Sequence, residues 1–137
     1  MNFKTFESPQ KWFRFEYPAN WEILVVEGIP AFFDPEDSGV LQINSLEHKE
    51  KEADSEQELI NYLKIQEIEY NEDLVARFQN KQGTQIVSCE FMKDDRHWCV
   101  YSISNGKRLI LATFNTDGKI TDSMYITLTK ILSSIRF

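Results

Sequence analysis

The stretch Phe13-Arg14-Phe15-Glu16-Tyr17-Pro18-Ala19-Asn20-Trp21 decides the fold, because its alternating aromatic residues lead into a proline turn that ends on a tryptophan. Phe13, Phe15 and Tyr17 are two residues apart, the spacing that places side chains on one face of a β-strand. Pro18 has no backbone N–H to donate to a neighbouring strand, so the strand is expected to end there. We therefore expect a sheet built around these aromatic residues and Trp21.

Length and composition indicate one domain over residues 1–137. A chain of this length suits a single hydrophobic core, since typical domains contain about 100 to 150 residues. Hydrophobic residues make up 42% of the sequence, and ten Phe, five Tyr and three Trp provide large apolar side chains for an interior. Only five Gly and four Pro are present, which leaves little for linkers.

The formal charge of −7 argues against a nucleic-acid partner, because affinity for a phosphate backbone depends on Lys and Arg. The longest aliphatic runs, residues 23–26 and 109–112, have the length of strands and fall far short of the roughly twenty residues that cross a bilayer. The first residues lack the apolar segment of a signal peptide. We therefore expect a cytoplasmic protein that does not enter a membrane.

The first part of the chain predicts strands, because aromatic and β-branched residues alternate with proline and glycine breaks. The expected strands are Lys11–Tyr17, Trp21–Glu27, Ala31–Phe33 and Val40–Leu46. A capping box then follows, in which Ser55 accepts from the backbone of Glu58 and the Glu58 side chain reaches back. This motif predicts a helix from Ser55 to about Tyr70.

The second part predicts another group of strands and a closing helix. The expected strands are Leu74–Phe78, Thr84–Met92, His97–Ser104 and Arg108–Asn115. Apolar residues then recur at spacings of three and four between Ile120 and Ile135, which is typical of a helix that packs one side on a sheet. The predicted fold is α+β: a central antiparallel sheet of two meanders, flanked by two helices, in the order β-β-β-β-α-β-β-β-β-α.

Two motifs resemble the PsbP-like superfamily, whose members have the Mog/PsbP-type α+β fold and include uncharacterised bacterial proteins. One is the aromatic-Tyr17-Pro18-x-x-Trp21 element, and the other is the ending Ile131-Leu132-Ser133-Ser134-Ile135-Arg136-Phe137. The resemblance implies a fold that spans nearly the whole chain. It also implies a non-enzymatic role in docking on another protein, such as that of a bacterial chaperone, an adaptor or an immunity-type protein.

His97-Trp98-Cys99 is the motif closest to a catalytic site, because it places an imidazole and a thiol on the same face of a strand. No third residue that would orient the histidine is evident. The alternative hypothesis is therefore a small-molecule-binding protein or thiol-dependent hydrolase, with a pocket beside Arg96, His97 and Cys99. Cys89 and Cys99 lie on successive strands, either as separate core thiols or as a redox pair; an odd loop between the strands would set them opposite each other and an even loop would offset them.

The sequence indicates neither a metal site nor a cofactor site. Asp34-Pro35-Glu36-Asp37-Ser38-Gly39 resembles the start of a calcium loop, but the twelfth position is Ser45 and not the bidentate glutamate that such loops need. Two histidines and two cysteines do not complete a tetrahedral zinc set. The glycines form no phosphate-binding motif.

The predicted central helix carries apolar residues on two sides. At 100° per residue, Leu59, Tyr62 and Leu63 form the side that packs on a sheet, whereas Ile65 and Ile68 fall on the opposite side. Such a pair is either an ordinary exposed hydrophobic pair or a contact surface. We predict Ile65 and Ile68 as partner-binding residues, the partner being another protein or a second copy of the chain.

Overall fold

The structure, a computed structural model, describes residues 2–47, 54–105 and 107–137. In this part of the chain, five strands precede the first α-helix and four more lie between the two α-helices. The elements are β1 (Phe3–Glu7), β2 (Arg14–Pro18), β3 (Glu22–Val26), β4 (Ile29–Phe33), β5 (Val40–Glu47), α1 (Ser55–Ile65), the short 3-10 helix η1 (Glu72–Leu74), β6 (Val75–Gln79), β7 (Gln85–Lys93), β8 (Arg96–Ser104), β9 (Arg108–Asp117) and α2 (Asp122–Ser133).

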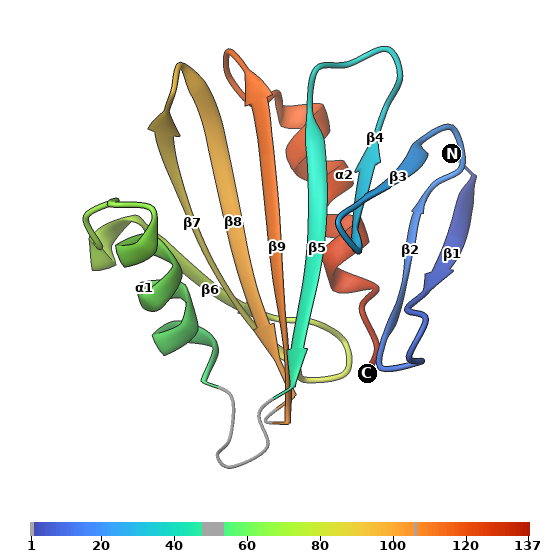
Figure 1. The fold of residues 1–137 in the computed structure, drawn as a ribbon, viewed down its shortest axis with the longest axis horizontal. Coiled ribbons are helices and arrows are strands. Elements are labelled where there is room, and N and C mark those ends of the chain that lie inside the picture. The colour runs from blue at the N-terminus through green and yellow to red at the C-terminus, as the bar shows by residue number, and fades with distance from the viewer. Residues whose placement is uncertain (1, 48–53, 106) are drawn as a thin grey trace.

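Seven strands form one antiparallel sheet in the order β3-β4-β5-β9-β8-β7-β6. The strands β3 to β5 make one meander and β6 to β9 make the other, and the two meanders join where β5 pairs with β9 (Figure 1). The predicted α+β class, with a sheet of two meanders and two helices, is therefore confirmed. The β3 and β6 strands are the two edges of this sheet.

The N-terminal aromatic strand does not belong to the central sheet, which corrects our expectation of a sheet built around it. It forms β2, which pairs with the unpredicted strand β1 in a separate two-stranded sheet. Phe13, Phe15, Tyr17 and Trp21 are nevertheless buried in the main core. The alternation of aromatic side chains thus identified a buried face correctly, because a strand can bury one face by packing across a sheet as well as by extending it.

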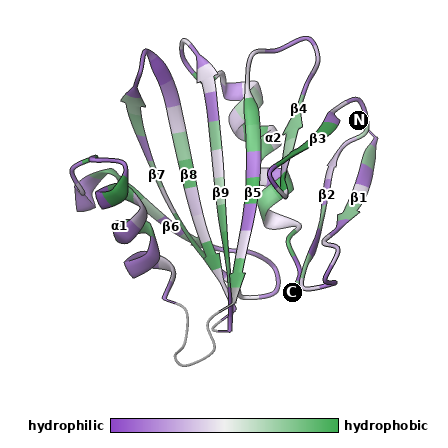
Figure 2. Cartoon of the chain, viewed as in Figure 1, coloured by the Kyte–Doolittle hydropathy of each residue, from purple (hydrophilic) through white to green (hydrophobic). Residues whose placement is uncertain are grey.

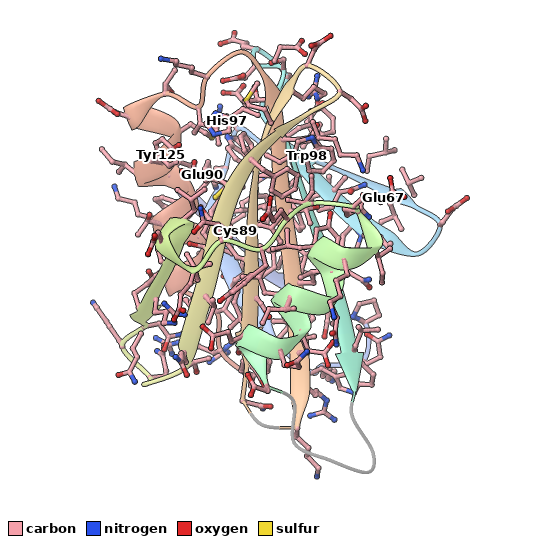
Figure 3. The ribbon with its side chains drawn as sticks, turned by 90° about the vertical axis from the view of Figure 1, so that its left-hand side faces the viewer. Glu67, Cys89, Glu90, His97, Trp98 and Tyr125 are labelled. Carbon is pink, nitrogen blue, oxygen red and sulfur yellow. The ribbon has the colours of Figure 1, made fainter. Side chains whose placement is uncertain are left out.

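The two helices cover opposite faces of the sheet. Leu128, Ile131 and Leu132 of α2 pack in the same core cluster as the N-terminal aromatic residues. Leu59 and Leu63 of α1 pack on the other face, mainly against β7 and β8; Figure 3 shows the sheet edge-on between the helices. Among the described residues, no helix combines the length and apolar character needed to cross a membrane.

Two hairpin turns contain two residues each, and all four turn residues have positive φ angles. Glu27 and Gly28 (φ 52° and 82°) connect β3 to β4, and Asp94 and Asp95 (φ 53° and 60°) connect β7 to β8. Positive φ at both central positions is the signature of a type I′ turn, whose twist suits a tight hairpin. These short turns fix the register of both strand pairs.

The ends of α1 differ from the prediction. Asp54 is the N-cap residue, and its side chain accepts from the backbone N–H groups of Glu56 and Gln57, whereas we expected Ser55 in that role. The helix ends at Ile65 rather than near Tyr70, because Glu67 adopts a left-handed φ of 60°. A residue in this conformation commonly terminates a helix.

Candidate functional site

At the predicted pocket on β8, the His97 side chain already contacts other residues of the chain. His97 Nδ1 accepts a hydrogen bond from the backbone N–H of Ile120 at 3.2 Å, so the ring proton of the neutral imidazole lies on Nε2. That nitrogen lies 3.4 Å from Glu90 Oε1, and the Tyr125 hydroxyl donates to the same oxygen. Figure 3 shows His97, Glu90 and Tyr125 gathered on the α2 side of the sheet. Both imidazole nitrogens therefore have partners in the protein.

The two cysteines are separate core thiols. The two-residue turn between β7 and β8 pairs Cys89 with Val100 and Cys99 with Glu90, so the two thiols face opposite sides of the sheet. Cys89 belongs to the cluster under α1, and Cys99 to the cluster under α2. Burial raises the pKa of the Cys89 thiol to about 11 and that of the Cys99 thiol to about 12. A nucleophilic cysteine needs a lowered pKa, so this geometry does not activate either thiol.

Arg96 connects neighbouring segments of the sheet. Its Nε donates to Asn115 Oδ1 at 2.6 Å, its Nη1 to Asp117 Oδ1 at 2.5 Å, and its Nη2 to the Ser38 carbonyl at 3.2 Å. The structure thus brings Arg96, His97 and Cys99 onto one strand, but it does not arrange them around a shared pocket.

The acidic loop between β4 and β5 is stabilised by its own backbone. Asp34 Oδ1 accepts from the N–H of Glu36 at 3.0 Å, and Asp37 Oδ1 accepts from the N–H of Gly39 at 3.3 Å. Such contacts are typical of turns in which aspartate side chains stabilise the backbone. Among the described residues, no group of three or more His, Cys, Asp or Glu side chains is placed to hold a metal ion.

The predicted partner-binding pair is divided by the end of α1. Ile65 is 77% exposed, as expected for an outward-facing residue. Ile68 lies beyond the helix, where its N–H donates to the Leu63 carbonyl at 2.8 Å, and its side chain packs partly buried against the cluster under α1. The expectation that both residues face outward was wrong for Ile68, because the chain reverses at Glu67 and directs this side chain to the core. Partner binding by Ile65 and Ile68 stays a prediction.

Among the described residues, the longest run of consecutive exposed apolar side chains lies on β3. Four consecutive aliphatic side chains, at positions 23 to 26, are 39%, 57%, 61% and 48% exposed. They lie at an edge of the seven-stranded sheet, paired on one side only, with β4. Figure 2 shows this apolar strand on the side of the sheet away from α1. The sequence predicted a strand over this run and excluded a membrane span, but it did not predict that the four side chains are exposed; the glutamates on both sides of the run were the available signal.

Negative charge accompanies this edge. Residues 15–47 contain seven acidic residues and no Lys or Arg, so this segment alone accounts for a charge equal to that of the whole protein. Glu22 and Glu27 flank the four aliphatic residues directly. The apolar run is therefore flanked along the chain by negative charge.

Positive charge gathers elsewhere, at a shallow hollow of about 600 Å³ between the β1–β2 sheet and the end of α2. Its lining includes Arg14, Lys81, Lys130 and Arg136. All four residues are exposed, as is typical of solvated surface cations. No charged side chain that lines this hollow is buried, so we do not assign a ligand to it.

Comparisons with solved structures identify the fold. No protein-family model and no curated protein matches the sequence. A crystal structure from Bacteroides thetaiotaomicron superposes with a TM-score of 0.73 at 15% identity; the match covers 99% of this chain, which spans only 48% of that protein. The solution structure of cyanobacterial PsbP (CyanoP) from Synechocystis superposes with a TM-score of 0.68 at 14% identity, covering 98% of this chain and 91% of that one. The fold is therefore PsbP-like, as the sequence motifs implied.

Proposed function

We propose that this PsbP-like domain is a non-enzymatic protein-docking module that binds its partner at β3. The observation that carries the proposal is the run of four adjacent aliphatic side chains, each at least 39% exposed, on an edge strand. Chaperone, adaptor and immunity-type roles are all forms of such docking.

The energetics of the edge favour a partner. Apolar surface removed from water contributes roughly 25 cal/mol per Å², and β3 presents such surface on both faces. Exposed edge strands usually carry lysine or proline, which prevents unwanted pairing, but β3 contains neither residue. A strand without these features suits an edge that forms a contact.

The enzyme alternative has less support. It requires an activated thiol or an available histidine beside Arg96, and these groups are either buried with a raised pKa or hydrogen-bonded within the chain. No observation at this strand favours a substrate over the internal contacts.

Affinity capture from a lysate of the source cells tests docking. We would compare the wild type with an Ile23→Lys, Val25→Lys double variant of the edge and with an Ile65→Lys variant of α1 as the matched control. All three proteins must show equal thermal melting. A protein retained by the wild type and the α1 variant but lost by the edge variant supports docking at β3.

Other outcomes contradict the proposal in different ways. Loss with the Ile65→Lys variant alone would move the interface to α1, as first predicted from the sequence. Capture of no protein by any of the three would reject docking and favour a small ligand.

A further inference from the structure

In the part of the chain that the structure describes, β3 pairs with a strand on one side only, so its backbone has hydrogen-bonding groups without a strand partner at defined positions. Its two-residue turn makes Val26 and Ile29 the closing pair, and such a closing pair is hydrogen-bonded in a tight hairpin. Alternation then directs the amide groups of Leu24 toward β4 and those of Ile23 and Val25 away from it. Pro30, which lacks an N–H, lies opposite Val25 at a position where no bond to β3 is lost.

The side chains of β3 specify an apolar neighbour. Ile23 and Val25 lie on the sheet face that α2 covers, and Leu24 and Val26 on the opposite face, as their pairing with β4 requires. Both faces of the strand are open at the edge. A segment beside β3 therefore meets apolar surface above and below its own backbone, which suits β-branched side chains at successive positions.

The glutamates beside the aliphatic run indicate which charges a segment bound at β3 would carry at its ends. Glu22 and Glu27 stand at the two ends of the aliphatic run, and residues 15–47 contain no Lys or Arg. Like charges on paired strands are destabilising and opposite charges are stabilising. A second copy of the chain would bring four of these glutamates into one short ribbon, so charge favours a basic segment over self-association.

We infer that β3 accepts an extended apolar segment with Lys or Arg at both ends, which joins the central sheet as an eighth strand. This inference rests on the proposed docking function and names the chemistry of its partner. The outward amide groups of Ile23 and Val25 provide the hydrogen bonds, the aliphatic run provides apolar contact, and the flanking glutamates pair with the basic ends. This is β-strand addition at an exposed sheet edge.

A labelled probe peptide, Lys-Thr-Val-Ile-Val-Thr-Lys, tests the inference by fluorescence anisotropy. The informative pair of variants is Val25→Pro and Val25→Thr, because proline removes the outward N–H while threonine keeps it. Both proline and threonine are compatible with an extended backbone at an edge position. The inference predicts binding about fivefold weaker for Val25→Pro than for Val25→Thr, the effect of one lost hydrogen bond, with equal melting temperatures.

A charge-reversed peptide, Glu-Thr-Val-Ile-Val-Thr-Glu, tests the role of the flanking glutamates. It should bind at least about tenfold more weakly than the probe peptide at low salt, and the difference should shrink at high salt because screening weakens surface charges. Equal binding of the two peptides, or equal binding to the two Val25 variants, overturns the inference.

The results separate this inference from the function on which it rests. If the probe peptide fails to bind while lysate capture still depends on β3, docking stands and strand addition by a basic segment is wrong. If sedimentation shows a dimer that the Ile23→Lys, Val25→Lys variant abolishes, the occupant is a second copy of the chain and the inference is also wrong.

Discussion

Replacing Ile65 and Ile68 by alanine, one at a time, should affect the free energy of unfolding very differently, although each substitution removes the same atoms. Ile65 is 77% exposed at the last residue of α1. Its truncation leaves no cavity, and the higher helix propensity of alanine offsets the lost contacts. Ile68 packs against the cluster that contains Leu59 and Leu63, so its truncation removes part of a core contact.

The expected magnitudes follow from burial. Truncating a fully buried isoleucine to alanine costs about 2–5 kcal/mol. Ile68 is partly buried, so Ile68→Ala should lower the free energy of unfolding by about 1–2 kcal/mol. Ile65→Ala should change it by less than about 0.5 kcal/mol in either direction.

Urea unfolding followed by tryptophan fluorescence measures both values. The slope of the unfolding free energy against urea should be the same for both variants and the wild type, since the surface exposed on unfolding hardly changes. Equal losses from the two substitutions, or a larger loss from Ile65→Ala, would refute the placement of the helix end and of both side chains.

Three further predictions concern other positions. Gly39→Ala should destabilise the protein by about 1–3 kcal/mol, because the added Cβ would lie 2.3 Å from Phe114 Cζ in the core; an unchanged urea midpoint would contradict that close approach. Glu67→Gly should raise the unfolding free energy by about 1 kcal/mol, because glycine adopts the left-handed φ of 60° without strain, and a thermal melt at or below that of the wild type would oppose this. Burial raises the pKa values of Cys89 and Cys99 to about 11 and about 12. The stability that the two protonated thiols contribute is therefore complete below the unfolded-state pKa near 9 and is lost as the pH rises through about 11 to 12. Above pH 9, the urea midpoint of the wild type should fall more steeply than that of a Cys89→Ala, Cys99→Ala variant, and equal slopes would contradict this prediction.

The buried aromatic residues and the positions of most strands could be predicted because each depends on a local pattern, whereas β1 and the pairing of β5 with β9 were not predicted. The two-residue alternation of Phe13, Phe15 and Tyr17 identified a buried face. The alternation does not distinguish a strand that joins the central sheet from one that packs against it, because both arrangements bury the same side chains.

The exposed surface was harder to predict, because similar sequences have opposite environments in this fold. The aliphatic run at residues 109–112 lies in the central strand β9, where Leu109, Ile110 and Ala112 are at most 1% exposed. The run at residues 23–26 lies at an edge and is open to solvent. Only the tertiary pairing of strands distinguishes the two runs.

The prediction of where α1 ends was wrong for a different reason. The apolar spacing continued past the helix, and no glycine or proline marked the stop. Glu67 adopts the left-handed conformation that glycine usually supplies. Ile68 was therefore assigned to the wrong side.

Amide hydrogen exchange measured by NMR, with and without the probe peptide, tests docking at β3 most directly. In the free protein, the amides of Ile23 and Val25 should exchange quickly, and those of Leu24 and Val26 more slowly, because only the latter face β4. Adding the probe peptide should slow exchange at Ile23 and Val25. Slow exchange at these two amides in the free protein, or exchange that a bound peptide leaves unchanged, would contradict the account.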